Sequence, residues 1–220
     1  AIKRSSVTSI AKALGYTPRS SRSSTASVKF TIIPDPSYQN STLTLSRDAT
    51  FTASVDNVTY SFYPSETVTA SLETIGSSSG FVFENLLLKE GSRISNNFLI
   101  DANNLSGPLT IANAGVDTTS IRVRVQKSAT DLSIEGYNLS NTLLDVSSTS
   151  RAYFIEETID GLYTIRFGDG VVGKKLEAGN LVIVDYLVTR GAAANGAKGF
   201  TCTSTISGSA EGKSFDSAST

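Results

Sequence analysis

Apolar and polar residues alternate one by one along much of this chain, and no other feature constrains its fold as strongly. Successive side chains of a β-strand point to opposite faces of a sheet, so a period of two predicts strands with one buried face. The alternation runs through residues 26–32, 51–62, 68–72, 119–127 and 162–167. Hydrophobic residues make up 39% of the sequence, which is enough for a core. The chain is therefore predicted to be mainly β.

Turn signals separate these strands. Asp56-Asn57 lies between two alternating runs and predicts a tight hairpin, because both residues tolerate the positive φ that a type I′ turn requires. Residues 76–80 read Gly-Ser-Ser-Ser-Gly and predict a flexible loop. Residues 181–188 are almost continuously apolar, so we expect them to form a strand in the middle of a sheet.

The N-terminal residues follow a helical period instead. Val7, Ile10, Ala11 and Leu14 are spaced as one apolar helix face, and Gly15 suits the end of that helix. A helix of about ten residues is not stable alone in water, so its apolar face must pack against something. We take Val7, Ile10 and Leu14 as candidate protein-contact residues, within the protein or on a partner.

The same segment is basic. Before Thr25 there is no acidic residue, and the basic residues are Lys3, Arg4, Lys12, Arg19 and Arg22. This charge is either a solvated surface or a contact surface for an acidic partner protein, to which Lys12, Arg19 and Arg22 would contribute. Nucleic acid is disfavoured as a partner, because no aromatic residues interleave with the charges and the net charge of the chain is −1.

Composition and turn residues predict how the chain is organised. We expect two small β-rich lobes, sandwich-like, with one short N-terminal helix. The expected parts are a helix and basic linker (1–25), a first lobe (26–115), a second lobe (116–203) and a polar linker or the start of a further domain (204–220). The boundary between the lobes is placed in the Asn- and Gly-rich residues 101–117. Because the chain does not begin with Met, we expect it to be a piece of a longer protein.

Residue types that are missing narrow the function. There is no His, which removes Ser-His-Asp and Cys-His catalysis and the commonest metal ligand. Cys202 is the single cysteine, so neither a disulfide within the chain nor a cysteine zinc site can form. The sequence contains no run of ~20 apolar residues, so no membrane-spanning helix is predicted. We expect no enzyme activity, no catalytic residue, no metal, no cofactor and no small-molecule substrate.

One glycine-rich motif invites a phosphate-binding interpretation. Gly168-Asp169-Gly170, followed by Gly173, joins two predicted strands and opens no helix, so no helix N-terminus awaits a phosphate. We therefore interpret Gly168, Asp169, Gly170 and Gly173 as a structural turn, with positive φ expected at Gly168 and Gly170.

Several motifs together resemble a known family. They are Phe167-Gly168-Asp169-Gly170, Glu177-Ala178-Gly179, the stretch 191–196 that ends in Asn-Gly, and the Leu-Gly-Tyr-Thr-Pro-Arg-Ser run at 14–20. In these motifs the chain resembles the baseplate J-like family of contractile-tailed phages, and within it the baseplate wedge proteins. The motifs lie near both ends of the chain, whereas residues 34–115 are less distinctive.

The resemblance implies a structural role. Such proteins assemble into a ring of wedges around the tail hub, so self-association and binding to other baseplate wedge proteins are implied. The implied location is the virion tail baseplate, assembled in the host cytoplasm, and no catalytic residue carries over.

Two alternatives to this role stay open, and a third, an enzyme, is disfavoured. One is the related baseplate subunit of a bacterial contractile injection system, which the sequence does not distinguish from a phage protein. The other is a carbohydrate- or surface-binding β module of an adhesin. Such a module usually binds sugars on an aromatic platform that contains Trp. This chain has no Trp, and Tyr137 and Tyr153 are weak substitutes for it. A tail-associated hydrolase ranks third, because the chain lacks His.

Overall fold

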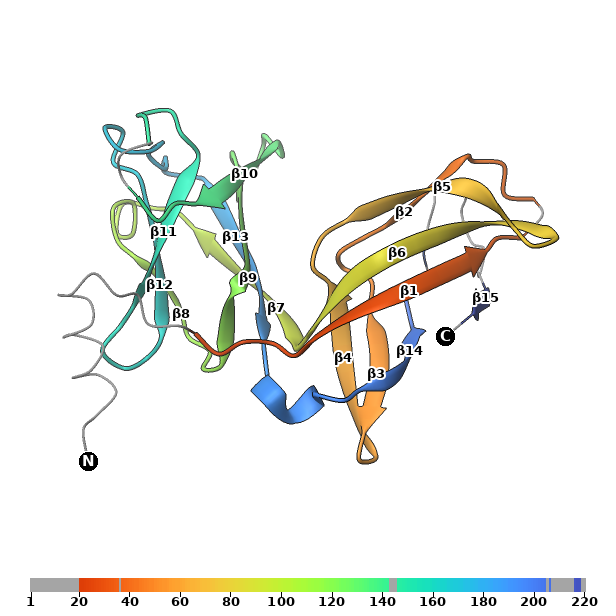
Figure 1. Cartoon of the computed structure of the whole chain (residues 1–220). Coiled ribbons are helices and arrows are strands. Elements are labelled where there is room, and N and C mark those ends of the chain that lie inside the picture. Colours follow the sequence, from red (N-terminus) through yellow and green to blue (C-terminus); the bar gives the residue numbers. More distant parts are fainter. Residues whose placement is uncertain (1–19, 36, 143–145, 205, 207–215, 219–220) are drawn as a thin grey trace. The chain divides into compact units, whose positions relative to one another are not determined.

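The structure, a computed structural model, describes residues 20–35, 37–142, 146–204, 206 and 216–218. Within these residues the chain forms fifteen strands and one 3-10 helix of four residues (Figure 1). The prediction of a mainly β fold is therefore confirmed. The helix predicted around residues 7–14 lies outside the described residues.

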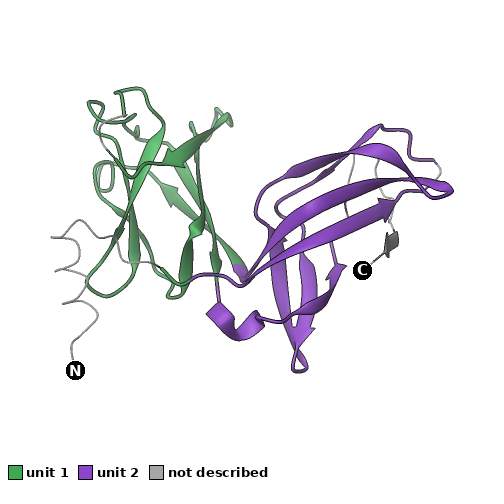
Figure 2. Ribbon diagram, viewed as in Figure 1, with its two compact units in different colours: residues 1–21, 93–188 green, residues 22–92, 189–220 purple. Residues whose placement is uncertain are grey.

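Contacts between residues divide the chain into two compact units (Figure 2). Unit 1 comprises residues 1–21 and 93–188, and unit 2 comprises residues 22–92 and 189–220. This division differs from the expected lobes 26–115 and 116–203. Residues 109–111, in the expected boundary, form a strand that pairs within unit 1, and residues 198–202 return to pair within unit 2. Turn-forming composition therefore marked loops inside a unit rather than a boundary between units.

Unit 2 is built on an eight-stranded sheet with the order β14-β3-β4-β6-β1-β15, in which β5 pairs with β6 and with β2. Its strands are β1 (Thr25–Ile33), β2 (Thr42–Leu45), β3 (Phe51–Val55), β4 (Val58–Pro64), β5 (Val68–Ile75), β6 (Ser78–Glu90), β14 (Lys198–Cys202) and β15 (Asp216–Ala218). The long strand β6 pairs with β5 along its first part and with β4 near its end. A core rich in phenylalanine results, in which Phe30 and Phe51 meet edge to face at 5.1 Å between ring centroids.

Strand β6 contains an irregularity that interrupts its alternation of buried and exposed residues. Phe81 and Phe83 are buried before the break, and Leu86 and Leu88 are buried after it. The register with β1 shifts here, and Asn85 has a φ of 52°. The bulge adds one residue, so the buried positions change from odd to even numbers and no single period describes the strand.

The β5–β6 connection is tighter than expected. Ile75 pairs with Ser78, and Gly76 takes a φ of 62°. The prediction of a flexible loop over 76–80 is therefore wrong, because residues 78–80 already belong to β6. The predicted hairpin between β3 and β4 is confirmed: Val55 pairs with Val58, and Asp56 and Asn57 have φ values of 49° and 62°.

The C-terminal residues contribute to unit 2 as well. Residues 204–220 were expected to be a linker or the start of a further domain. Instead Ile206 is buried, and β15 pairs with the end of β1 through Ile32 and Ser217. Strand pairing uses backbone groups, so a segment with few apolar side chains can still join a sheet.

Unit 1 is built on a seven-stranded sheet with the order β7-β13-β9-β10-β11-β12-β8. Its strands are β7 (Ser92–Leu99), β8 (Leu109–Ile111), β9 (Val116–Gln126), β10 (Ile134–Leu139), β11 (Ala152–Glu157), β12 (Tyr163–Phe167) and β13 (Leu181–Val188). Both edge strands pack on one core, β7 through Ile94 and Phe98 and β8 through Leu109 and Ile111, so the sheet curls almost into a barrel. Strand β13 lies inside the sheet, as its apolar run predicted.

A buried residue, Glu90, connects three parts of unit 2: the end of β6, the residues before β1 and the residues after β13. Glu90 is only 3% exposed, and its Oε2 accepts hydrogen bonds from Thr189 Oγ1 at 2.6 Å and from Arg190 N at 3.2 Å. The backbone N–H of Glu90 donates to Ser24 O at 2.9 Å. Ser24 Oγ in turn lies 2.7 Å from the carbonyl oxygen of Gly191, the first residue of the 3-10 helix (Gly191–Ala194). The end of β6 is thus tied to the residues before β1 and to those after β13.

We predict that Glu90→Ala destabilises the protein by about 2–4 kcal/mol, because the buried hydroxyl of Thr189 and the part-buried N–H of Arg190 lose their acceptor. The check is the melting temperature followed by far-UV circular dichroism. Glu84→Ala is the matched control: Glu84 pairs with Lys29 at 2.7 Å, but both side chains are more than half exposed. The control should cost at most about 1 kcal/mol. Equal losses in the two variants would contradict the role given to Glu90.

Candidate functional site

The glycine motif forms a closed turn after β12. Asp169 Oδ1 accepts hydrogen bonds from Val171 N at 2.8 Å and from Val172 N at 2.9 Å. Gly170 N donates to Gly173 O at 3.0 Å. The two backbone N–H groups favour the charged carboxylate, so they lower the pKa of Asp169. The turn therefore uses the Asp169 carboxylate to satisfy its own backbone.

Two different constraints require glycine in this turn: a positive φ at some positions and a close backbone approach at another. Gly170 and Gly173 have φ values of 94° and 84°, so the expectation for Gly170 is confirmed. The expectation of positive φ at Gly168 is wrong. A Cβ on Gly168 would lie 2.2 Å from the carbonyl carbon of Gly173, so this residue must be glycine because two backbone segments approach each other closely.

We predict that Gly168→Ala destabilises unit 1 by about 1–3 kcal/mol, because the backbone of Gly173 must move to admit the methyl group. Gly136→Ala in β10 is the matched control. No atom lies within 4 Å of a Cβ built there, and φ is not positive. The control should be neutral or slightly stabilising. Thermal melts of the two variants provide the comparison, and an unchanged melting temperature for Gly168→Ala would contradict the close approach.

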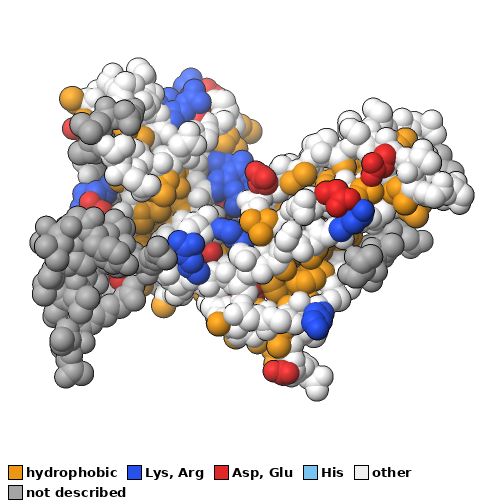
Figure 3. All heavy atoms as spheres, viewed as in Figure 1, with side chains coloured by type: hydrophobic (Ala, Val, Ile, Leu, Met, Phe, Trp, Pro, Cys, Tyr) orange, Lys and Arg blue, Asp and Glu red, His pale blue; other side chains and the backbone are white. Residues whose placement is uncertain are grey.

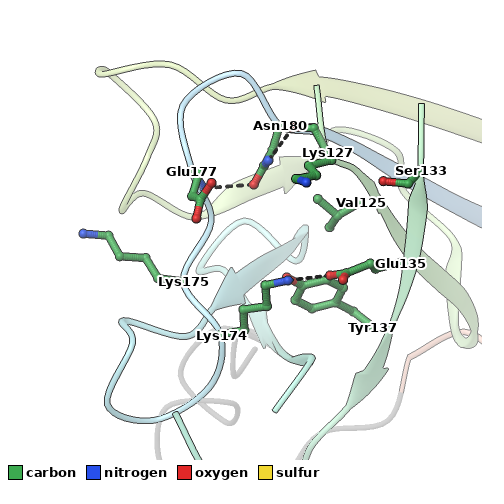
Figure 4. A pocket seen from close by; sticks show the side chains of 9 residues that line it. All are labelled: Val125, Lys127, Ser133, Glu135, Tyr137, Lys174, Lys175, Glu177 and Asn180. Atoms are coloured by element: carbon green, nitrogen blue, oxygen red, sulfur yellow. Dashed lines mark hydrogen bonds and ion pairs between the residues drawn. The ribbon is translucent and has the colours of Figure 1, made fainter. Parts of the chain in front are cut away.

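Beside the turn, a cavity of about 270 Å³ opens into one end of the curled sheet (Figure 4). Its lining residues are Val125, Lys127, Ser133, Glu135, Tyr137, Lys174, Lys175, Glu177 and Asn180. Val125 and Tyr137 are buried core residues and give the cavity an apolar inner wall. Figure 4 shows Lys174 reaching past the Tyr137 ring toward Glu135. We call this cavity the lysine pocket.

Ion pairs set the electrostatics of the lysine pocket. Lys174 Nζ lies 2.6 Å from Glu135 Oε2, and Arg151 Nε lies 3.5 Å from the same oxygen. The hydrogen bond from Lys174 lowers the pKa of Glu135. Burial raises the pKa of Tyr137 to about 12, so its phenol stays neutral at physiological pH. Lys127 pairs with Asp131 at 3.0 Å.

Asn180 fixes the outer wall of the lysine pocket. Its Oδ1 accepts a hydrogen bond from Glu177 N, and its Nδ2 donates to Lys127 O, both at 2.8 Å. These bonds tie the segment that follows the glycine turn to the end of β9. The turn and the pocket are therefore one continuous piece of structure. A smaller cavity of about 130 Å³ lies on the other side of this segment and shares Lys175 with the pocket.

The candidate protein-contact residues fall mostly outside the described chain. Val7, Ile10, Lys12, Leu14 and Arg19 precede its first described residue, and Arg22 is exposed in unit 2. The four turn residues, in contrast, are brought together as described above. The lysine pocket was missed from the sequence: the pair Lys174-Lys175 was visible beside the motif, but nothing indicated that Glu135 would face it.

The aromatic residues considered for an adhesin are in the core. Tyr137 and Tyr153 are 6% and 3% exposed. Tyr137 meets Phe167 edge to face at 5.5 Å between centroids, and Tyr153 Oη donates to Ile121 O at 3.3 Å. Both rings are therefore largely covered by the core. Tyr137 lines the lysine pocket, and neither ring forms an exposed aromatic platform of the kind that stacks on a sugar.

Within the described residues, no group of three or more His, Cys, Asp or Glu side chains could hold a metal ion. No helix there is long and apolar enough to cross a membrane. Cys202 is half-buried, and burial raises the pKa of its thiol.

The chain is similar in sequence to a phage baseplate protein. The chain is 26% identical to the baseplate wedge protein gp6 of Enterobacteria phage T4, over 222 aligned residues. The alignment covers 92% of this chain, which spans 31% of the length of that relative. No family model matches the chain. The similarity indicates a protein related to a phage baseplate component.

Proposed function

We propose that this chain is a structural subunit of a contractile-tail baseplate wedge, which acts by assembling with other proteins around the tail hub. The observation that carries the proposal is the similarity to a phage baseplate wedge protein over 92% of the chain. The similarity runs through both units rather than one isolated motif. The proposed location is the virion tail baseplate, which the similarity supports, and the proposed place of assembly is the host cytoplasm.

In this proposal the chain binds proteins and catalyses no reaction. It self-associates and binds other baseplate wedge proteins, and it needs no cofactor, metal, nucleic acid or small-molecule substrate. The proposal fits a chain without His, in which the Asp169 carboxylate is engaged by its own turn. The related subunit of a bacterial injection system would act in the same way.

The test is reconstitution with the wedge proteins encoded beside this chain. Sedimentation velocity and negative-stain images should show a defined complex that the chain enters in fixed stoichiometry. A chain that stays monomeric with every neighbour at micromolar concentration would contradict the proposal. Binding on a glycan array without any such complex would favour the adhesin alternative.

The N-terminal residues give a sharper prediction. Leu14→Asp should block the complex if the apolar face of Val7, Ile10 and Leu14 meets a partner, because each of these side chains contributes about 1.5–3 kcal/mol when fully buried. Unchanged assembly in Leu14→Asp would contradict a contact role. A melting temperature measured alongside separates lost contact from unfolding.

Charge reversal tests the basic residues of the same segment. Lys12→Glu, Arg19→Glu and Arg22→Glu should each slow association at low salt and reduce its dependence on salt, because opposite charges steer the encounter. Lys198→Glu is the control, an exposed lysine of β14 with the same change of charge. Stopped-flow light scattering gives the rates. Equal rates for all variants from low to high salt would contradict the steering role.

A further inference from the structure

The lysine pocket has the features of a site for another molecule's side chain. Its volume of about 270 Å³ lies just below the ~300–1,000 Å³ of sites for small molecules and cofactors. At ~30 Å³ per water, that volume corresponds to about nine waters. A space of this size suits one large side chain better than a cofactor.

The pocket combines an apolar wall with a cationic rim. Val125 and the Tyr137 ring form the wall, and three lysines and two glutamates line the cavity. Glu135 is shared between Lys174 and Arg151, so one carboxylate serves two cations. A second carboxylate bound to Lys174, which lines the pocket, would leave Glu135 to Arg151, so each cation would then have its own partner.

The side chains at the rim are held before any ligand arrives. Lys174 N donates to Ser150 O at 2.7 Å, while Lys174 Nζ is fixed on Glu135. Gly173 N donates to Ser147 O at 3.0 Å, which anchors the turn immediately before it. Rigid placement of this kind reduces the entropy that a ligand must overcome on binding.

We propose that the lysine pocket is a socket for an acidic segment of a partner protein. An apolar or aromatic side chain of that segment packs against Val125 and Tyr137. A carboxylate beside it binds Lys174, with Lys175 at the outer rim. This inference rests on the proposed function, since it assumes that partners of the chain are proteins.

The first experiment uses a matched pair of probes on the 220-residue chain. N-acetyl-phenylalanine carries an aromatic ring beside a carboxylate, and N-acetyl-phenylalanine amide has the same ring without the charge. In ¹⁵N NMR titrations, the acid should shift the amides of Lys127, Glu135 and Lys174 with a millimolar Kd. The amide should bind at least threefold more weakly. Lys174→Gln should weaken the acid at least threefold, whereas Lys198→Gln, on the other unit, should leave it unchanged.

Three results would overturn the proposal. Equal affinity for acid and amide would mean that the rim does not recognise a carboxylate. Equal affinity for inorganic phosphate or acetate at the same residues would mean a simple anion site without a role for the apolar wall. The absence of shifts at tens of millimolar probe would mean that the pocket binds neither group.

The same variants separate this proposal from the proposed function. If the probe binds but reconstitution gives no complex, the socket stands and the baseplate role fails. If the complex forms normally with Lys174→Gln and the probe does not bind, the baseplate role stands and the socket fails. Lys174→Gln and Lys198→Gln should have similar melting temperatures, because exposed ion pairs contribute little to stability.

Discussion

Unit 2 depends on the buried carboxylate of Glu90. The chain passes between the two units after residues 21, 92 and 188, so unit 2 is assembled from two separate stretches of sequence. Glu90 binds the start of the second stretch at Thr189, and its backbone binds Ser24 in the first. β14 then pairs with β3 across nearly 150 residues of sequence. Unit 2 therefore depends on non-local pairing, which generally makes folding slow.

Local signals in the sequence predicted local structure well. The β3–β4 hairpin follows from Asp56-Asn57, and the internal position of β13 follows from its apolar run, because each depends on residues that are adjacent in the chain. A β-bulge cannot be predicted in this way. At Asn85 one extra residue reverses which face of β6 is buried, so the alternation is regular on each side of the bulge but not across it. The division into units was missed because it depends on long-range pairing, of β8 with β12 in unit 1 and of β14 with β3 in unit 2.

The candidate site divides in the same way. The sequence predicted the glycine turn but not the reason for the glycine at position 168. Gly168 is required because the backbone of Gly173 lies close to it, and not because its own φ is positive. The lysine pocket could not be predicted, because Glu135 and Lys174 are 39 residues apart and meet only when β10 and the turn are placed. Lys127 and Asn180, 53 residues apart, were equally hidden.

The glycine turn can influence the neighbouring pocket without holding a ligand itself. The Asp169 carboxylate satisfies two backbone donors within the turn, and Gly168 lets the turn close on itself. The chain then leaves the turn in a fixed direction, so Leu176 is buried and Lys174 is directed at Glu135. A binding site is most effective when its side chains are held in position before the ligand arrives. In the proposed socket, the glycine motif would supply that rigidity and the neighbouring lysines would supply the charge.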